Sequence, residues 1–154
     1  MNIPVTTLIV LTPIVSGIGA SYLYPSGTEL GKNNPVRPPK WVFGVIWPIL
    51  YLLIGISWSL LRNKQNENKK QTWIVDTLFI LLNILLFAWL YAANKLKNYT
   101  YSYYIIVSIM TIANLIAILS FKIEEPYILL WIPFLIWITI ASNLNYSIAY
   151  SATD

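Results

Sequence analysis

Aromatic residues recur at helical spacing in the stretch Trp47, Tyr51, Gly55 and Trp58. Intervals of three and four residues place side chains on one face of an α-helix. Such a face has two interpretations. It is either a seam where the helix packs against another helix, which the spacing alone favours, or one wall of a pocket for a flat aromatic ligand.

Two further stretches combine aromatic rings with carboxamides at similar spacing. The second stretch consists of Asn83, Phe87, Tyr91 and Asn94, and the third of Phe134, Trp137, Ala141 and Asn145. A carboxamide deep in an apolar environment is costly unless it is hydrogen-bonded. One such stripe is typical of packing, whereas three that face one another predict a cavity in a helical bundle. That cavity would suit a large, mostly apolar ligand held by a few polar groups.

Residues for conventional catalysis are missing. The chain has no cysteine and no histidine, so it lacks the usual ligands of zinc, copper, haem iron and iron–sulfur clusters. Cysteine nucleophiles and serine–histidine systems are excluded for the same reason. No acid–base pair stands out either. We therefore predict no catalytic residues, no metal site and no required cofactor.

The composition indicates the environment that positions these stripes. Of the 154 residues, 57% are hydrophobic and only 10% are charged, compared with about 25% charged in ordinary soluble domains. A soluble fold of this size has too little interior to hide so much apolar surface. The net charge of +4 comes from short basic patches between apolar runs. These suit anionic lipid headgroups, and we expect no nucleic-acid partner.

Five apolar runs are each long enough to cross a bilayer as a helix. They span residues 3–24, 39–61, 72–94, 101–121 and 126–150, approximately. The first run lacks a basic n-region and an A-x-A cleavage pattern, so we interpret it as a retained helix. We predict an all-α membrane protein, a five-transmembrane-helix bundle that forms a single domain over residues 1–154. Basic residues divide five against five between the two sides, so the topology stays open.

Tryptophans inside these runs need explanation. Trp47, Trp58, Trp89 and Trp137 lie far from the ends of their runs, where interfacial aromatic residues gather. A tryptophan buried at that depth needs a partner for its indole N–H or a cavity to line. Asp76, near the start of the third run, is the exception to the lack of charge within the runs.

Small residues give the first run a different character. Ser16 and Ala20, and Gly17 and Ser21, are spaced four residues apart, which lets another helix approach closely. The partner helix could belong to the same bundle or to a second copy of the chain.

The second, third and fifth runs together resemble one known family. The second run contains Pro38-Pro39-Lys40-Trp41-Val42-Phe43-Gly44, followed by Trp47, Leu50-Tyr51 and Gly55. The fifth contains Pro133-Phe134, Trp137, Ala141 and Leu144-Asn145, and the third contains Leu82-Asn83. This pattern closely resembles that of the TspO/translocator protein family, also called tryptophan-rich sensory proteins or peripheral benzodiazepine receptors.

The sequence departs from the family pattern at several positions. The residues before the Pro-Pro pair are Asn34-Pro35-Val36-Arg37, where the family usually has Lys-Pro-x-Trp. Phe79 stands where the family has Gln, and Leu86 where it has Trp. No Lys or Arg follows Tyr146, so the family's sterol-recognition pattern is incomplete.

The resemblance implies a homodimeric five-helix membrane protein whose pocket binds porphyrins, haem among them, sterol-like lipids or benzodiazepine-site drugs. By the same resemblance, the ligand-binding residues are Trp41, Phe43, Trp47, Tyr51, Asn83, Phe87, Trp137, Ala141 and Asn145. Lys32, Arg37 and Lys40 would cover the mouth and attract the propionates of a porphyrin. The membrane would be the cell membrane in a bacterium, and the mitochondrial outer or another organelle membrane in a eukaryote.

The function that we expect first is a membrane receptor or carrier for tetrapyrrole-like ligands, with a role in transport or stress sensing. The second is a light-dependent porphyrin-degrading enzyme that uses buried tryptophans. An ion-coupled transporter ranks third, because only Asp76 approaches the mid-membrane position that such proteins use. A purely structural membrane partner with a dry interior is the fourth.

Overall fold

The computed structural model describes residues 3–25, 37–65 and 68–150, and all of its regular elements there are helices. The elements are α1 (Ile3–Leu23), α2 (Lys40–Lys64), α3 (Lys69–Leu90), the π-helix η1 (Tyr91–Lys95), α4 (Tyr99–Ile123), the 3-10 helix η2 (Glu125–Leu130) and α5 (Ile132–Tyr150). Within the described residues, five helical segments are long and apolar enough to span a membrane. The predicted class, an all-α five-span membrane protein, is confirmed.

The observed bounds differ from the predicted ones mainly at polar ends. The second helix continues to Lys64 and the third begins at Lys69, because polar residues at the bilayer surface extend helices without cost in lipid. The predicted fifth helix, 126–150, is divided into η2 and α5. Pro133 lies in the first turn of α5, where a backbone N–H has no helical partner to lose.

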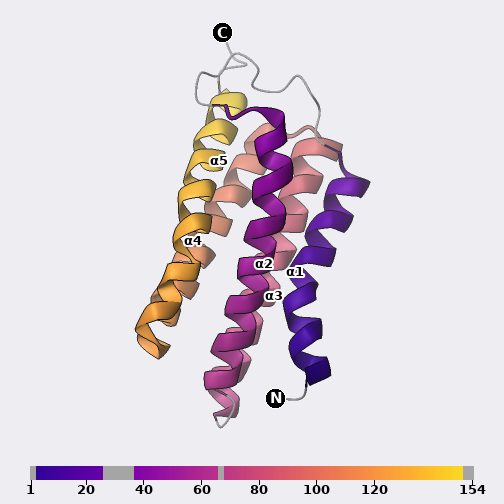
Figure 1. Cartoon of the computed structure of the whole chain (residues 1–154). Helices are drawn as coiled ribbons and strands as arrows, with labels where there is room; N and C mark the ends of the chain where they lie inside the picture. Colours follow the sequence, from indigo (N-terminus) through magenta and orange to yellow (C-terminus); the bar gives the residue numbers. More distant parts are fainter. Residues whose placement is uncertain (1–2, 26–36, 66–67, 151–154) are drawn as a thin grey trace.

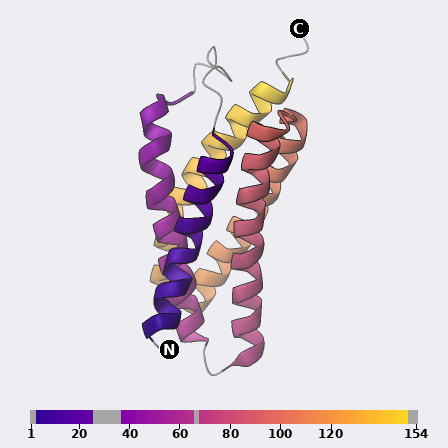
Figure 2. The same ribbon diagram turned by 90° about the vertical axis from the view of Figure 1, so that its right-hand side faces the viewer.

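The helices form one bundle (Figures 1 and 2) in which α1 packs mainly on α2, and α4 packs on α3 and α5. Figure 1 shows that α1 begins and α5 ends at opposite ends of the bundle, as an odd number of spans requires. We call the end that holds Lys40 and Tyr99 the Lys40 end. The opposite end, which holds Lys64 and Glu125, is the Lys64 end.

Two glycines allow α1 and α2 to approach closely. A Cβ atom at Gly17 of α1 would overlap the ring of Tyr51, and one at Gly55 of α2 would overlap the backbone of Val10. The small-residue face of α1 therefore packs, at Gly17, against a helix of its own bundle. Gly55, which shares the predicted aromatic face, belongs to this seam.

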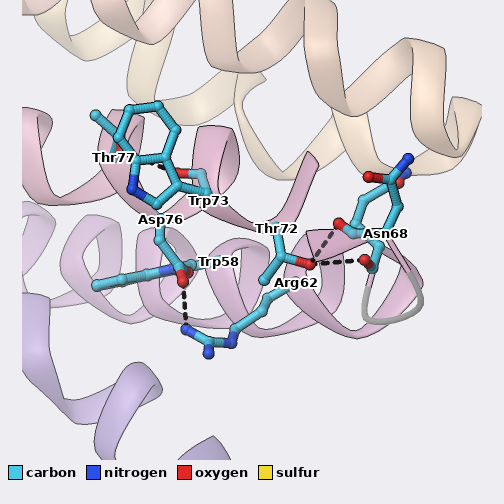
Figure 3. A network of polar contacts seen from close by, with 8 residues as sticks. Trp58, Arg62, Asn68, Thr72, Trp73, Asp76 and Thr77 are labelled. Carbon is cyan, nitrogen blue, oxygen red and sulfur yellow. Dashed lines mark hydrogen bonds and ion pairs between the residues drawn. The ribbon is translucent and has the colours of Figure 1, made fainter. Parts of the chain in front are cut away.

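The carboxylate of Asp76 is neutralised at the Lys64 end (Figure 3). Trp58 Nε1 donates a hydrogen bond to Asp76 Oδ1 at 2.8 Å, and Arg62 Nη1 donates to Oδ2 at 2.5 Å. The ring of Phe79 lies parallel to that of Trp58, with centroids 5.5 Å apart. These contacts tie α2 to α3 and give one of the four deep tryptophans the partner that its depth demands.

Side chains fill the Lys64 half of the interior. Trp131 is 1% exposed, and its Nε1 donates to Ser57 Oγ at 2.8 Å. Phe79 and Phe134 contact the same indole ring and are also buried. This half of the bundle is therefore a closed core, which leaves the Lys40 half as the place to look for ligand space.

The Gly55 seam is testable with a single methyl group. Gly55→Ala should lower the melting temperature of the detergent-solubilised protein by several degrees, because the new Cβ forces α1 away from α2. Overpacking of this kind costs about 1–3 kcal/mol, against a helix-propensity gain of about 1 kcal/mol. Gly19→Ala is the matched control, since a Cβ there meets nothing within 4 Å. Equal melting temperatures for the two variants would contradict this account of the seam.

Candidate ligand-binding site

A cavity of about 500 Å³ lies at the Lys40 end of the bundle. Its walls come from α1, α2, the end of α3 with η1, the first residue of α4, and α5. The lining residues are Gly17, Ile18, Ser21, Tyr24, Pro25, Arg37, Lys40, Phe43, Gly44, Trp47, Pro48, Tyr51, Trp89, Leu90, Ala93, Asn94, Tyr99, Leu144, Asn145 and Ile148. A volume of this size lies within the usual range of about 300–1,000 Å³ for small-molecule sites.

Trp47 is the centre of an aromatic wall. Its ring stacks on Tyr51 with centroids 5.5 Å apart and an interplanar angle of 28°. Trp89 lies 5.5 Å from it at 36°, and Trp137 lies 6.4 Å from it, edge to face. Phe43 contacts Trp137 at 5.3 Å. Because Phe43, Trp47 and Tyr51 of α2 and Trp89 of α3 line the cavity, the wall combines rings from two helices, and Trp137 of α5 packs against it.

Polar contacts join α3, α4 and α5 beside the cavity. Trp89 Nε1 of α3 and Ser102 Oγ of α4 both donate to Asn145 Oδ1 of α5, at 3.0 and 2.8 Å. The Nδ2 atom of Asn145 donates to the carbonyl oxygen of Ala141 at 2.8 Å. Ser102 is fully buried and does not line the cavity. The cluster joins three helices and holds the Asn145 amide in one orientation.

The rim is shaped by the π-helix that ends the third span. Asn94 in η1 donates from Nδ2 to the carbonyl oxygen of Tyr24 at 2.8 Å, which ties the end of α1 to the end of α3. The ring of Tyr24 contacts Phe87 and Tyr91 edge to face, at 5.5 and 5.2 Å. Short π-helical segments are frequent at functional sites, and this one contributes Ala93 and Asn94 to the cavity lining.

Charge is distributed unequally between the two ends. Arg37 and Lys40 line the cavity, and Lys95 lies nearby at the end of η1. The acidic side chains that the structure describes, Asp76, Glu124 and Glu125, all belong to the Lys64 end. The Lys64 end also carries basic residues, namely Arg62, Lys64, Lys69, Lys70 and Lys122. The difference is that an anionic ligand at the cavity would meet no acidic side chain among the described residues.

Four of the nine predicted ligand-binding residues line the cavity: Phe43, Trp47, Tyr51 and Asn145. Trp137 and Ala141 are buried in α5 beside this wall without lining it, and the indole Nε1 of Trp137 has no hydrogen-bond partner within the described residues. Trp41 points away from the core with 69% of its surface exposed. Of the three basic residues predicted at the mouth, Arg37 and Lys40 line the cavity, and Lys32 lies outside the described residues.

Asn83 and Phe87 do not line the cavity. They border a separate gap between α1, α2 and α3 that has no room for a water molecule. Asn83 Oδ1 accepts a hydrogen bond from Ser16 Oγ at 3.0 Å, and its Nδ2 donates to the carbonyl oxygen of Phe79 at 2.8 Å. The carboxamide thus finds the partner that its depth requires in α1 and in its own helix.

Sequence reasoning did not assign several cavity residues. The sequence predicts only that Trp89 lies deep in its span, and that depth is the available signal, since its indole N–H is used in the site. The spacing of Gly17 predicts helix packing, and Tyr24 stands at the end of the first run, where interfacial aromatic residues gather. Gly17 does pack against Tyr51, and both Gly17 and Tyr24 line the cavity. No periodicity could show this, because α1 contributes its last turns from a different part of the chain.

Comparison with known proteins gives a consistent result. The model of the TspO/MBR family matches residues 5–151. The tryptophan-rich protein TspO of Archaeoglobus fulgidus is 30% identical over 152 residues, which cover 96% of this chain and 97% of the relative. The protein CrtK of Rhodobacter capsulatus is 26% identical over 116 residues, 72% of this chain and 69% of the relative. TspO of Chlorobaculum tepidum is 26% identical over 130 residues, 84% and 78% of the two chains. With five apolar spans and a match over nearly its whole length, this chain is an integral, multi-pass membrane protein and belongs to the TspO/MBR family.

Proposed function

We propose that the protein is a membrane receptor or carrier for a flat, mostly apolar ligand of the tetrapyrrole type. The observation that carries this proposal is the cavity of about 500 Å³, with an aromatic wall on one side and Arg37 and Lys40 at its mouth. A porphyrin combines the two properties that such a site selects, a broad π-surface and carboxylates at one edge. The transport or stress-sensing role expected for the family is part of the same proposal.

The aromatic wall would supply most of the affinity. A macrocycle placed along α2 would contact Trp47 and Tyr51 where they line the cavity, and stacking on an aromatic ring is worth about 1–3 kcal/mol per contact. Exclusion of water from a lipid-embedded cavity adds the hydrophobic contribution of the ligand's own surface. The ligand would enter from the Lys40 end, where the cationic side chains lie.

The structure also bears on two other functions. A purely structural partner with a dry interior would leave the cavity without a role. An ion-coupled transporter would use Asp76, but this carboxylate is engaged by Arg62 and Trp58 at the Lys64 end, remote from the cavity. Sterol-like lipids fit the apolar wall but make no use of the cations. The homodimer implied by the family resemblance stays a prediction.

The aromatic wall can be tested by titration with protoporphyrin, followed through quenching of tryptophan fluorescence in detergent. Trp47→Leu should raise the Kd about tenfold, because the central ring of the wall is lost. Trp73→Leu is the matched control, since Trp73 is 68% exposed and lies near the start of α3 at the Lys64 end. An unchanged Kd for Trp47→Leu would remove the cavity as the binding site.

The role of the cations can be separated from that of the rings. Lys40→Gln should weaken protoporphyrin binding about two- to fivefold, as expected for one partly exposed charge pair. Binding of protoporphyrin dimethyl ester, which carries no carboxylate, should not change. Lys122→Gln, at the last turn of α4 on the opposite end, should affect neither ligand. Equal losses for the acid and the ester would show that Lys40 acts through packing rather than charge.

A light-dependent porphyrin-degrading enzyme is the second candidate. It is favoured by one observation, the contact of three indole rings, Trp47, Trp89 and Trp137, beside the cavity. Illumination of the protoporphyrin complex in air distinguishes the two functions. If the protein is a receptor, the porphyrin should bleach at the same rate in the wild type and in the Trp47→Leu variant. If it is an enzyme, the wild type should form a new absorbing product that the variant does not form.

A further inference from the structure

The Asn145 amide is the best-defined polar group of the cavity. Its oxygen accepts two hydrogen bonds, from Trp89 Nε1 at 3.0 Å and from Ser102 Oγ at 2.8 Å. One of its two N–H groups donates to the carbonyl oxygen of Ala141 at 2.8 Å. Within the part of the chain that the structure describes, the second N–H of this cavity-lining residue has no partner.

The orientation of this amide follows from the chemistry of its neighbours. An indole N–H is a donor only, so Trp89 can contact the oxygen of Asn145 and not its nitrogen. The backbone carbonyl of Ala141 is an acceptor only, so it requires the nitrogen. A flip of the amide would place two donors together and two acceptors together. Each buried mismatch costs about 1–3 kcal/mol, which locks the oxygen towards α3 and α4.

The tyrosine hydroxyls of the cavity differ from the Asn145 amide in this respect. The hydroxyls of Tyr24, Tyr51 and Tyr99 can rotate, and each can either donate or accept a hydrogen bond. The locked amide of Asn145 can only donate, because both lone-pair directions of its oxygen are occupied. A ligand group that meets Asn145 must therefore be an acceptor.

We propose that Asn145 is a specificity-determining residue that selects ligands carrying a hydrogen-bond acceptor, such as a carbonyl or carboxylate oxygen, at the edge facing α5. Trp89 and Ser102 are its positioning residues. Ser102 acts without touching the ligand, since it is fully buried in α4 behind Asn145. The proposal depends on the proposed function only in that the cavity binds a flat apolar ligand, and it does not require that ligand to be a porphyrin.

Three tricyclic probes of nearly equal shape isolate the hydrogen bond. Fluorenone carries a carbonyl acceptor, fluorene carries a methylene at the same position, and carbazole carries an N–H donor there. Their Kd values for the full-length protein are measured by tryptophan quenching and corrected for partition into micelles. Fluorenone should bind about 3- to 10-fold more tightly than fluorene, the effect of one hydrogen bond, and carbazole should bind no better than fluorene.

Substitutions then show which residues produce the preference for fluorenone. Asn145→Leu should bring the fluorenone-to-fluorene ratio to about one. Trp89→Phe combined with Ser102→Ala removes both donors to the amide oxygen, so the Asn145 amide can flip. The affinity for carbazole relative to that for fluorenone should then be higher than in the wild type. The matched controls remove similar bonds elsewhere: Ser120→Ala, whose buried hydroxyl donates to Ile116 in the same helix, and Trp131→Phe, whose indole donates to Ser57. Both should keep the wild-type ratios.

A second measurement covers variants that fold poorly. In the isotope-labelled wild-type protein, fluorenone should shift the side-chain amide proton resonances of Asn145, and fluorene should shift them less. A preference for carbazole, an unchanged ratio in Asn145→Leu, or no saturable binding of any tricycle would overturn the proposal. Failure of protoporphyrin to bind while fluorenone selectivity persists would instead remove the porphyrin assignment and leave the role of Asn145 intact.

Discussion

A bilayer core supplies no water, so the polar groups inside this bundle must find partners within the protein. The consequences are visible at three depths. Asp76 is engaged by Arg62 and Trp58 at the Lys64 end, Asn83 bonds to Ser16 across the α1–α3 contact, and Asn145 is held by two donors beside the cavity. Each contact joins helices that lipid alone would not hold together. The polar residues are few, and they set which helices meet.

This constraint divides the bundle into two functional halves. At the Lys64 end, the Asp76 contacts and the packing around Trp131 close the interior. At the Lys40 end, the helices enclose a cavity instead. Because α2 runs through both halves, the closed half supports the position of Trp47 and Tyr51 in the open one. A rigid support of this kind reduces the ordering that a ligand would otherwise have to induce.

The two interpretations of the α2 aromatic face both apply, at different heights along the helix. Trp47 and Tyr51 line the cavity, whereas Gly55 and Trp58 pack against α1 and α3. Spacing could show that these residues share a face, because helical geometry alone determines that. It could not show where along the face the packing stops. That depends on how far neighbouring helices diverge, which is a property of the whole bundle.

The five spans, the membrane environment and the aromatic stripes could be predicted from the sequence, because hydrophobic length and helical periodicity are local properties. The sequence also predicted that buried carboxamides need partners and that a deep indole needs either a partner or a cavity to line. Trp137 departs from this prediction, since within the described residues its Nε1 has no partner and it does not line the cavity. Which groups the other indoles and the carboxamides bond to depends on how the helices pack. Asn83 and Asn145 look alike in the sequence, yet one closes a helix contact and the other borders a cavity. The difference arises because α1 covers Asn83, while η1 and the end of α5 leave space in front of Asn145.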